Sequence, residues 1–144
     1  MLPAMDGMAG ACDPLVEVLV PCLPLLEWRA PGFGRLSPEI ADKMAVCEIL
    51  GPDGMFIDPD IRFGLLVQRA HLLYPPHRHA AEELYLVLQG TALWAVDGEE
   101  PRPRRPGEFV HHAPRRTHAM RTEAEQLLAA WAWTGDIGAA TYSA

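Results

Sequence analysis

Residues 77–90 read HRHAAEELYLVLQG, in which two histidines and a glutamate pair run into an apolar stretch that stops at a glycine. Side chains on an extended strand alternate between its two faces, so His77 and His79 point the same way. Glu83 keeps that parity if the strand continues, whereas Glu82 faces the opposite side. The pattern therefore predicts that two imidazoles and one carboxylate converge on a single cavity.

A further histidine, His118, follows downstream of the turn Pro106-Gly107 and adds a fourth candidate donor. Such a set of nitrogen and oxygen donors suits zinc, iron(II), manganese, cobalt or nickel, and ligand type alone does not choose among them. The alternative is that these are solvated surface side chains. The joint spacing of His77, His79 and Glu83 ahead of a clean apolar strand favours a divalent metal site.

Composition predicts a soluble single domain. The 144 residues are 49% hydrophobic, which is enough for a core, and no apolar run is long enough to span a bilayer. A net charge of −7 argues against a nucleic-acid partner. The three cysteines lack CxxC spacing, and no basic segment precedes the apolar stretch at residues 15–26. We therefore expect reduced thiols and a cytoplasmic protein.

The chain divides into an arm at residues 1–40 and a domain at residues 41–144. The arm is rich in proline and glycine, and we expect it to lie over the core with one short helix around residues 14–20. In the domain, short apolar runs recur between turn signals at 45–50, 63–73, 84–88, 92–96, 108–111, 117–121 and 127–133. This rhythm predicts an all-β barrel or jelly roll that holds one ligand inside. The arginines at 102–105 are interpreted as a solvated loop.

The strand after the glutamate pair is apolar on both faces. Leu84, Leu86 and Leu88 lie opposite Glu83 and Tyr85, so the outer face of this strand needs a cover. We expect the cover to be the N-terminal arm or a second copy of the chain in a homodimer.

These residues resemble the two motifs of the cupin superfamily. The HxHxxxE spacing with a glycine at the end of residues 77–90 is similar to the first motif, and Pro106-Gly107-Glu108 leading to His118 is similar to the second. His71 and Arg115 stand where the motifs usually have glycine. The resemblance implies a cupin double-stranded β-helix, a jelly-roll barrel, with a short N-terminal arm or helix.

A closer resemblance is to the cupin-type dimethylsulfoniopropionate (DMSP) lyases. It covers about residues 45–135 and is carried by YPPHRHAAEELY at 74–85, PRRTHAMR at 114–121 and LLAAWAW at 127–133. It implies a carbon-sulfur lyase whose divalent metal is bound by His77, His79, Glu83 and His118. Tyr85 is the implied catalytic base, and the implied substrate-binding residues are Tyr74, Trp133 and, by alternate spacing, Trp131.

The chemistry of that reaction is consistent with these residue types. Cleaving DMSP to dimethyl sulfide and acrylate removes a proton alpha to a carboxylate while a neutral sulfide leaves the beta carbon. A metal acts as a Lewis acid toward the carboxylate and favours the phenolate of Tyr85, since a free phenol has a pKa of about 10. The sulfonium has no hydrogen-bond donors, so aromatic faces suit it.

Simpler interpretations stay open. Tyr85, Trp131 and Trp133 are alternatively interior aromatic residues, and His111 and His112 are interpreted as structural or solvent-facing. The same ligands also serve other metal-dependent cupin enzymes, such as a dioxygenase or isomerase of a small acid. A non-catalytic cupin that binds a metal-chelating small molecule is the third hypothesis, because a fold does not guarantee turnover.

Overall fold

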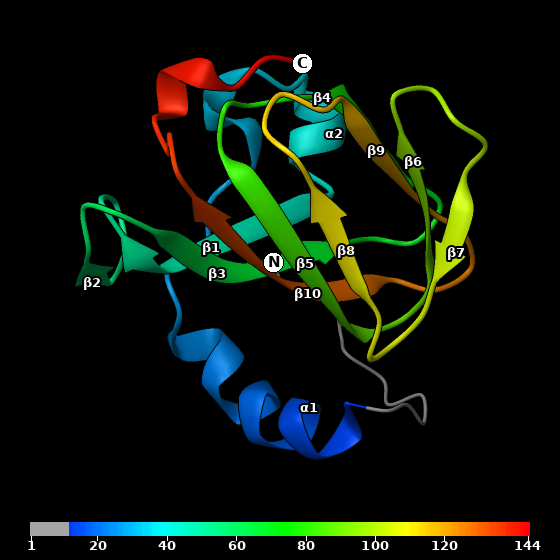
Figure 1. Ribbon diagram of the computed structural model, residues 1–144. Helices are drawn as coiled ribbons and strands as arrows, with labels where there is room; N and C mark the ends of the chain where they lie inside the picture. Colours follow the sequence, from blue (N-terminus) through cyan, green and yellow to red (C-terminus); the bar gives the residue numbers. More distant parts are fainter. Residues whose placement is uncertain (1–11) are drawn as a thin grey trace.

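The structure is a computed structural model that describes residues 12–144 (Figure 1). Its helical elements are short and mostly precede the strands: α1 (Asp13–Leu19), η1 (Val20–Leu25), η2 (Gly32–Gly34), α2 (Pro38–Ala41) and, near the C-terminus, η3 (Ala139–Thr141). The predicted helix is confirmed as α1, which carries Asp13 and a proline in its first turn, where both are favourable. None of the helices within residues 12–144 is long and apolar enough to cross a membrane.

The strands form two sheets that enclose a barrel. One sheet has the order β2-β1-β3-β10-β5-β8 and the other has the order β4-β9-β6-β7. Several neighbours, such as β3 and β10 or β4 and β9, are far apart in sequence, which is the topology of a jelly roll, so the predicted all-β barrel is confirmed. The strands are β1 (Met44–Gly51), β2 (Phe56–Ile57), β3 (Arg62–Gln68), β4 (Leu73–His77), β5 (Glu82–Gln89), β6 (Ala92–Val96), β7 (Arg102–Arg104), β8 (Phe109–His112), β9 (His118–Thr122) and β10 (Leu127–Thr134).

The outer face of the six-stranded sheet is covered by the N-terminal arm. Figure 1 shows α1 and η1, in blue, beneath the sheet that contains β5 and β10. Val16 and Leu23 of these helices belong to the same buried cluster as Leu88, and Leu86 packs against it. Leu84 stays 41% exposed. The expected cover by the arm is therefore confirmed for two of the three leucines, and a homodimer stays a prediction.

Two proline-containing segments form strands at sheet edges. The segment interpreted as a solvated loop instead includes β7, whose register pairs Pro103 with Leu93 of β6. Likewise β4 contains Pro75 and Pro76. Proline has no backbone N–H to donate, and an edge strand leaves one side of its backbone unpaired, so edge strands tolerate it. The prediction of a loop was therefore wrong for the arginine segment, whereas the prediction of a solvated face is confirmed for Arg102 and Arg105, which are exposed.

The strand that begins at residue 73 does not continue through Glu83. It ends as β4 at His77, and the chain then crosses from the four-stranded sheet to begin β5 in the six-stranded sheet at Glu82. The predicted run 63–73 is also interrupted, because β3 ends at Gln68 and His71 adopts a left-handed backbone with φ 57. The parity argument consequently holds within β5 but does not carry from His77 to Glu83.

Candidate metal centre and its pocket

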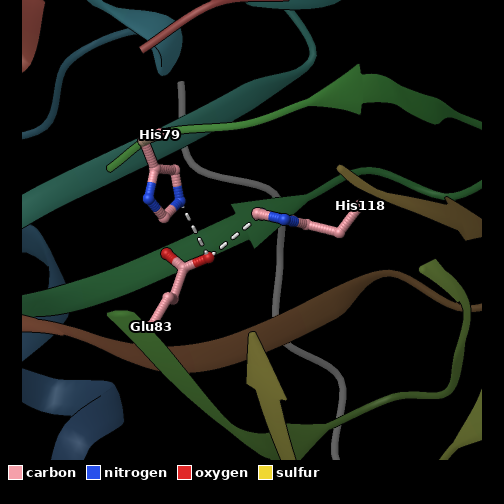
Figure 2. Close-up of side chains that lie close together, drawn as sticks. All are labelled: His79, Glu83 and His118. Carbon is pink, nitrogen blue, oxygen red and sulfur yellow. Dashed lines mark hydrogen bonds and ion pairs between the residues drawn. The ribbon is translucent and has the colours of Figure 1, made fainter. Parts of the chain in front are cut away.

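Three buried side chains converge at one end of the barrel (Figure 2). His79 lies on the crossing between the sheets, Glu83 on β5, and His118 at the start of β9. His79 Nε2 is 3.3 Å and His118 Nε2 is 3.1 Å from the same oxygen, Glu83 Oε1. The ligand atoms of the three residues all lie within 4.8 Å of one another. This triad is a candidate metal site.

His77, the other predicted ligand, lies beside the triad and is not a member of that group within the described residues. It pairs across the sheet with His118, and the two rings meet edge-on with centroids 4.2 Å apart. Burial, followed by the neighbouring His118, lowers the pKa of His77 well below its usual value. A neutral imidazole is the form that binds a metal, so His77 is a candidate fourth ligand.

The histidine tautomers are fixed by the backbone. Each ring places Nδ1 next to a carbonyl oxygen two residues away, at 2.8 Å for His77, 3.1 Å for His79 and 3.0 Å for His118. A carbonyl oxygen only accepts, so Nδ1 carries the proton and Nε2 of a neutral ring is a bare lone pair. This pairing of one ring nitrogen with the backbone is typical of metal-binding histidines.

The arrangement of these donor atoms fits a bound cation. With neutral rings, the lone pairs of His79 and His118 face the carboxylate of Glu83, and like lone pairs repel unless a proton or a cation lies between them. His118 Nε2 is buried and makes no hydrogen bond within the described residues, although it is close to Glu83. A single divalent ion satisfies all three donors, and imidazole and carboxylate are ligands for the first-row metals and zinc.

Glu83 is held as an anion. Burial alone would raise its pKa, but protons on the facing nitrogens of His118 and His79, in the place that a cation would take, outweigh burial and hold the pKa well below its usual range. Its second oxygen, Oε2, accepts a hydrogen bond from Trp133 Nε1 at 2.5 Å. The carboxylate thus brings a fixed negative charge into a buried site. Glu82 faces outward as predicted, where it pairs with His111 at 3.1 Å.

A pocket of about 470 Å³, part of it open to solvent, lies against the triad and is lined by His79 and Glu83. Six Phe, Tyr and Trp side chains line it, and they include every aromatic residue expected at the site: Tyr74, Tyr85, Trp131 and Trp133. Trp133 stacks on His79 with ring centroids 4.0 Å apart, and Tyr74 stacks on His77 at 3.9 Å. The structure therefore places metal donors and aromatic faces around one cavity.

Tyr85 lies on the same face of β5 as Glu83 and is 3% exposed. Burial, and then the charge of Glu83, raise the pKa of Tyr85 well above its usual value of 10.0. With its pKa raised in this way, Tyr85 is a phenol at neutral pH. Positive charge close by acts in the opposite direction and favours the phenolate.

Sequence reasoning missed two aromatic residues of the pocket. Tyr142, near the C-terminus, shares a hydrogen bond with the hydroxyl of Tyr74 at 2.9 Å. Phe33 of η2 packs against Tyr142 and against Trp133, with ring centroids 5.9 and 6.0 Å apart. Both lie outside the strands, so no strand periodicity indicated them. The glycines on either side of Phe33 were the one local signal of an unusual backbone.

Comparison with known proteins identifies the family. The family described as dimethylsulfoniopropionate lyase matches residues 3–129, which is most of the chain. The chain belongs to the DMSP lyase family. Among curated proteins, it is 34% identical over 112 residues to the DMSP lyase DddQ of Ruegeria pomeroyi, an alignment that covers 77% of this chain and 56% of that protein. This DMSP lyase family member thus spans about half the length of that relative.

Solved structures confirm the fold of this DMSP lyase family member. The crystal structure of DddQ from Ruegeria pomeroyi superimposes with a TM-score of 0.81 at 30% identity, covering 92% of this chain and 68% of that chain. A cupin-like protein from Thermotoga maritima gives a TM-score of 0.57 at 15% identity, covering 69% of this chain and 74% of that chain. The latter likeness concerns the fold alone, and it confirms the predicted cupin barrel.

Proposed function

We propose that this chain is a metal-dependent carbon-sulfur lyase that cleaves DMSP to dimethyl sulfide and acrylate. The observation that carries the proposal is the convergence of His79, Glu83 and His118 donor atoms within 4.8 Å, beside an aromatic pocket. Family membership supports the substrate, because DddQ is named a DMSP lyase. Ions of iron, manganese, zinc, cobalt and nickel all suit these donors as the cofactor.

The triad would hold the ion, with His77 as a weaker fourth ligand. The Nδ1–H bonds to backbone carbonyls orient each ring, and Trp133 orients the carboxylate of Glu83. When bound, the metal would supply Lewis-acid charge that stabilises negative charge on the substrate carboxylate and favours a nearby phenolate.

The aromatic walls would hold the sulfonium end of DMSP. That group is a cation without hydrogen-bond donors, and the faces of Trp and Tyr rings attract such cations. Tyr74, Trp131 and Trp133 line the pocket and are the proposed substrate-binding residues. The indole nitrogen of Trp131 makes no hydrogen bond within the described residues, so hydrogen bonding does not fix this side chain.

Tyr85 is the proposed base. It lies two residues after Glu83, on the same strand face, and lines the pocket. Its phenolate oxygen would take the proton from the alpha carbon of DMSP. The electron pair of that C–H bond forms the double bond of acrylate, and the C–S bond breaks with its pair going to sulfur, which leaves as neutral dimethyl sulfide.

The test is release of dimethyl sulfide into the headspace when metal-loaded protein is incubated with DMSP. We expect rapid release, and we expect Tyr85→Phe to lower kcat by about 10² to 10⁴, the contribution typical of a general base, with metal content unchanged. Tyr142→Phe is the matched control, because it removes a pocket hydroxyl that is bonded to Tyr74.

Three results would contradict the proposal in different ways. Full activity in Tyr85→Phe with normal metal content would exclude Tyr85 as the base while leaving the reaction in place. Oxygen consumption with a small organic acid would instead indicate a dioxygenase. Tight binding of DMSP without product would indicate a non-catalytic cupin.

A further inference from the structure

His112 occupies a buried position directly behind the proposed metal site. It ends β8, where its Cα is paired across the sheet with that of Glu83, and it is 1% exposed. Its imidazole lies parallel to that of His118, with ring centroids 3.8 Å apart and planes at 8°. The two rings are thus in flat contact over a whole face.

Trp94 of β6 fixes the orientation of His112. The indole Nε1–H donates a hydrogen bond to His112 Nε2 at 3.2 Å. An indole nitrogen only donates, so Nε2 of His112 accepts and its proton lies on Nδ1. That Nδ1 is buried and has no hydrogen-bond partner within residues 12–144. The bond to Trp94 therefore holds the plane of the His112 ring.

Neither Trp94 nor His112 lines the pocket. A substrate in that pocket touches neither of them, so a role in the chemistry has to pass through a neighbour. The neighbour in closest contact is His118, whose own Nδ1 is tied to the carbonyl oxygen of Arg116 at 3.0 Å. One edge of the His118 ring is thus held by the backbone and one face by His112.

We infer that Trp94 and His112 are positioning residues that hold the His118 imidazole in the plane where Nε2 faces Glu83. The inference rests on the proposed metal site. Rotation of His118 about its Cβ–Cγ bond would swing Nε2 away from the other donors, and the parallel His112 ring blocks that rotation.

Cobalt(II) titration of the metal-free protein tests this inference without any need for activity, because the visible absorption of bound cobalt reports its coordination geometry. His112→Leu removes the flat ring. We expect it to weaken cobalt affinity by about 10- to 100-fold and to alter the spectrum, because loss of a residue that orients a metal ligand typically has an effect of this size. His112→Phe keeps a flat ring and should retain more affinity. Trp94→Phe keeps an aromatic ring but removes the hydrogen bond to His112 together with part of the indole.

His111→Leu is the matched control, since His111 is the preceding residue and its side chain is 56% exposed beside Glu82. It should leave both affinity and spectrum unchanged. If His112→Leu does not fold, as judged by thermal melting, His112→Phe and Trp94→Phe carry the comparison.

Two outcomes overturn the inference and are distinguishable. No cobalt binding by the wild-type chain would remove the proposed metal site and this role with it. Normal wild-type binding, together with unchanged affinity and spectrum in folded His112 and Trp94 variants, would leave the metal site intact and show that the stack is ordinary core packing.

Discussion

Trp133 holds two members of the triad at once: its indole N–H donates to Glu83 Oε2 at 2.5 Å, and its ring stacks on His79 with centroids 4.0 Å apart. The arrangement follows from the register of β10 against β5, which pairs Trp133 with Glu83. We predict that Trp133→Phe, which retains an aromatic ring but no donor, lowers metal affinity by about 10- to 100-fold. Titration of the metal-free protein with zinc or cobalt measures this.

Trp131→Phe provides the comparison. Trp131 lies two residues earlier on the same strand and lines the same pocket, but its indole nitrogen makes no hydrogen bond within the described residues. The metal affinity of the Trp131→Phe variant should match that of the wild type. An equal loss in both variants would mean that tryptophan bulk, rather than the bond to Glu83, supports the site.

The two histidines of the HxH pair should differ in importance. His79 belongs to the triad, whereas His77 lies beside it. Loss of a residue that holds a metal ligand from outside typically lowers metal affinity by up to roughly 100-fold. We predict that His79→Ala lowers the affinity by more than this and that His77→Ala lowers it by less. Metal content after dialysis, measured by elemental analysis, separates the two. Equal losses of metal from the two variants would mean that His77 is as strong a ligand as His79, as the family resemblance implies.

Arg115 should be replaceable by glycine with a gain in stability. Its φ is 65, and its backbone N–H donates to the carbonyl of His79 at 2.8 Å. A left-handed backbone costs a side-chain-bearing residue roughly 1–2 kcal/mol, partly offset by the entropy that glycine loses on folding, so we predict a net gain of about 0.5–1 kcal/mol. Urea unfolding tests this, with Arg105→Gly, whose φ is not positive, as a destabilising control.

Asp53 should make the stability of the fold depend on pH. A hydrogen bond from Arg62 at 2.8 Å lowers the pKa of Asp53 below 3.8. A carboxyl whose pKa is depressed on folding stabilises the protein above its unfolded pKa, and that contribution is lost as the pH falls through the folded value. Because the Asp53 side chain is 57% exposed, we expect less than about 1 kcal/mol.

Unfolding free energies of Asp53→Asn and wild type at pH 7 and near pH 3 measure this contribution. The variant should be less stable at neutral pH, and the difference should shrink in acid. Asp60→Asn, in the next loop along the chain, is the control. A difference that stays constant with pH would contradict the assignment.

Sequence patterns located most of the strands, because strands depend on local alternation, whereas most residues of the candidate site came from the family resemblance. The strand at 92–96 was predicted with its bounds, and Glu83 and Tyr85 do share one buried face of β5. The two cupin motifs usually have glycine where this chain has His71 and Arg115. Both residues nevertheless have a left-handed backbone. The backbone geometry of those turns therefore persists where the residue type has changed.

The failures concern long-range geometry. Alternation cannot indicate that the chain leaves the strand after His77 and crosses to the other sheet, which separates the HxH pair into one triad member and one neighbour. It cannot place Phe33 or Tyr142 on the pocket wall, because both lie in irregular segments. The flat contact of His112 with His118 likewise depends on how β8 and β9 face each other across the barrel.

The central claim is that a metal held by His79, Glu83 and His118 is required for cleavage of DMSP. It is tested most directly by adding metal in known amounts to metal-free protein and following the initial rate of dimethyl sulfide release. The account predicts a rate that rises in proportion to added metal, levels off at about one equivalent per chain, and is absent in His118→Ala. A rate independent of metal, or no dimethyl sulfide with any of iron(II), manganese, cobalt, nickel or zinc, would contradict it.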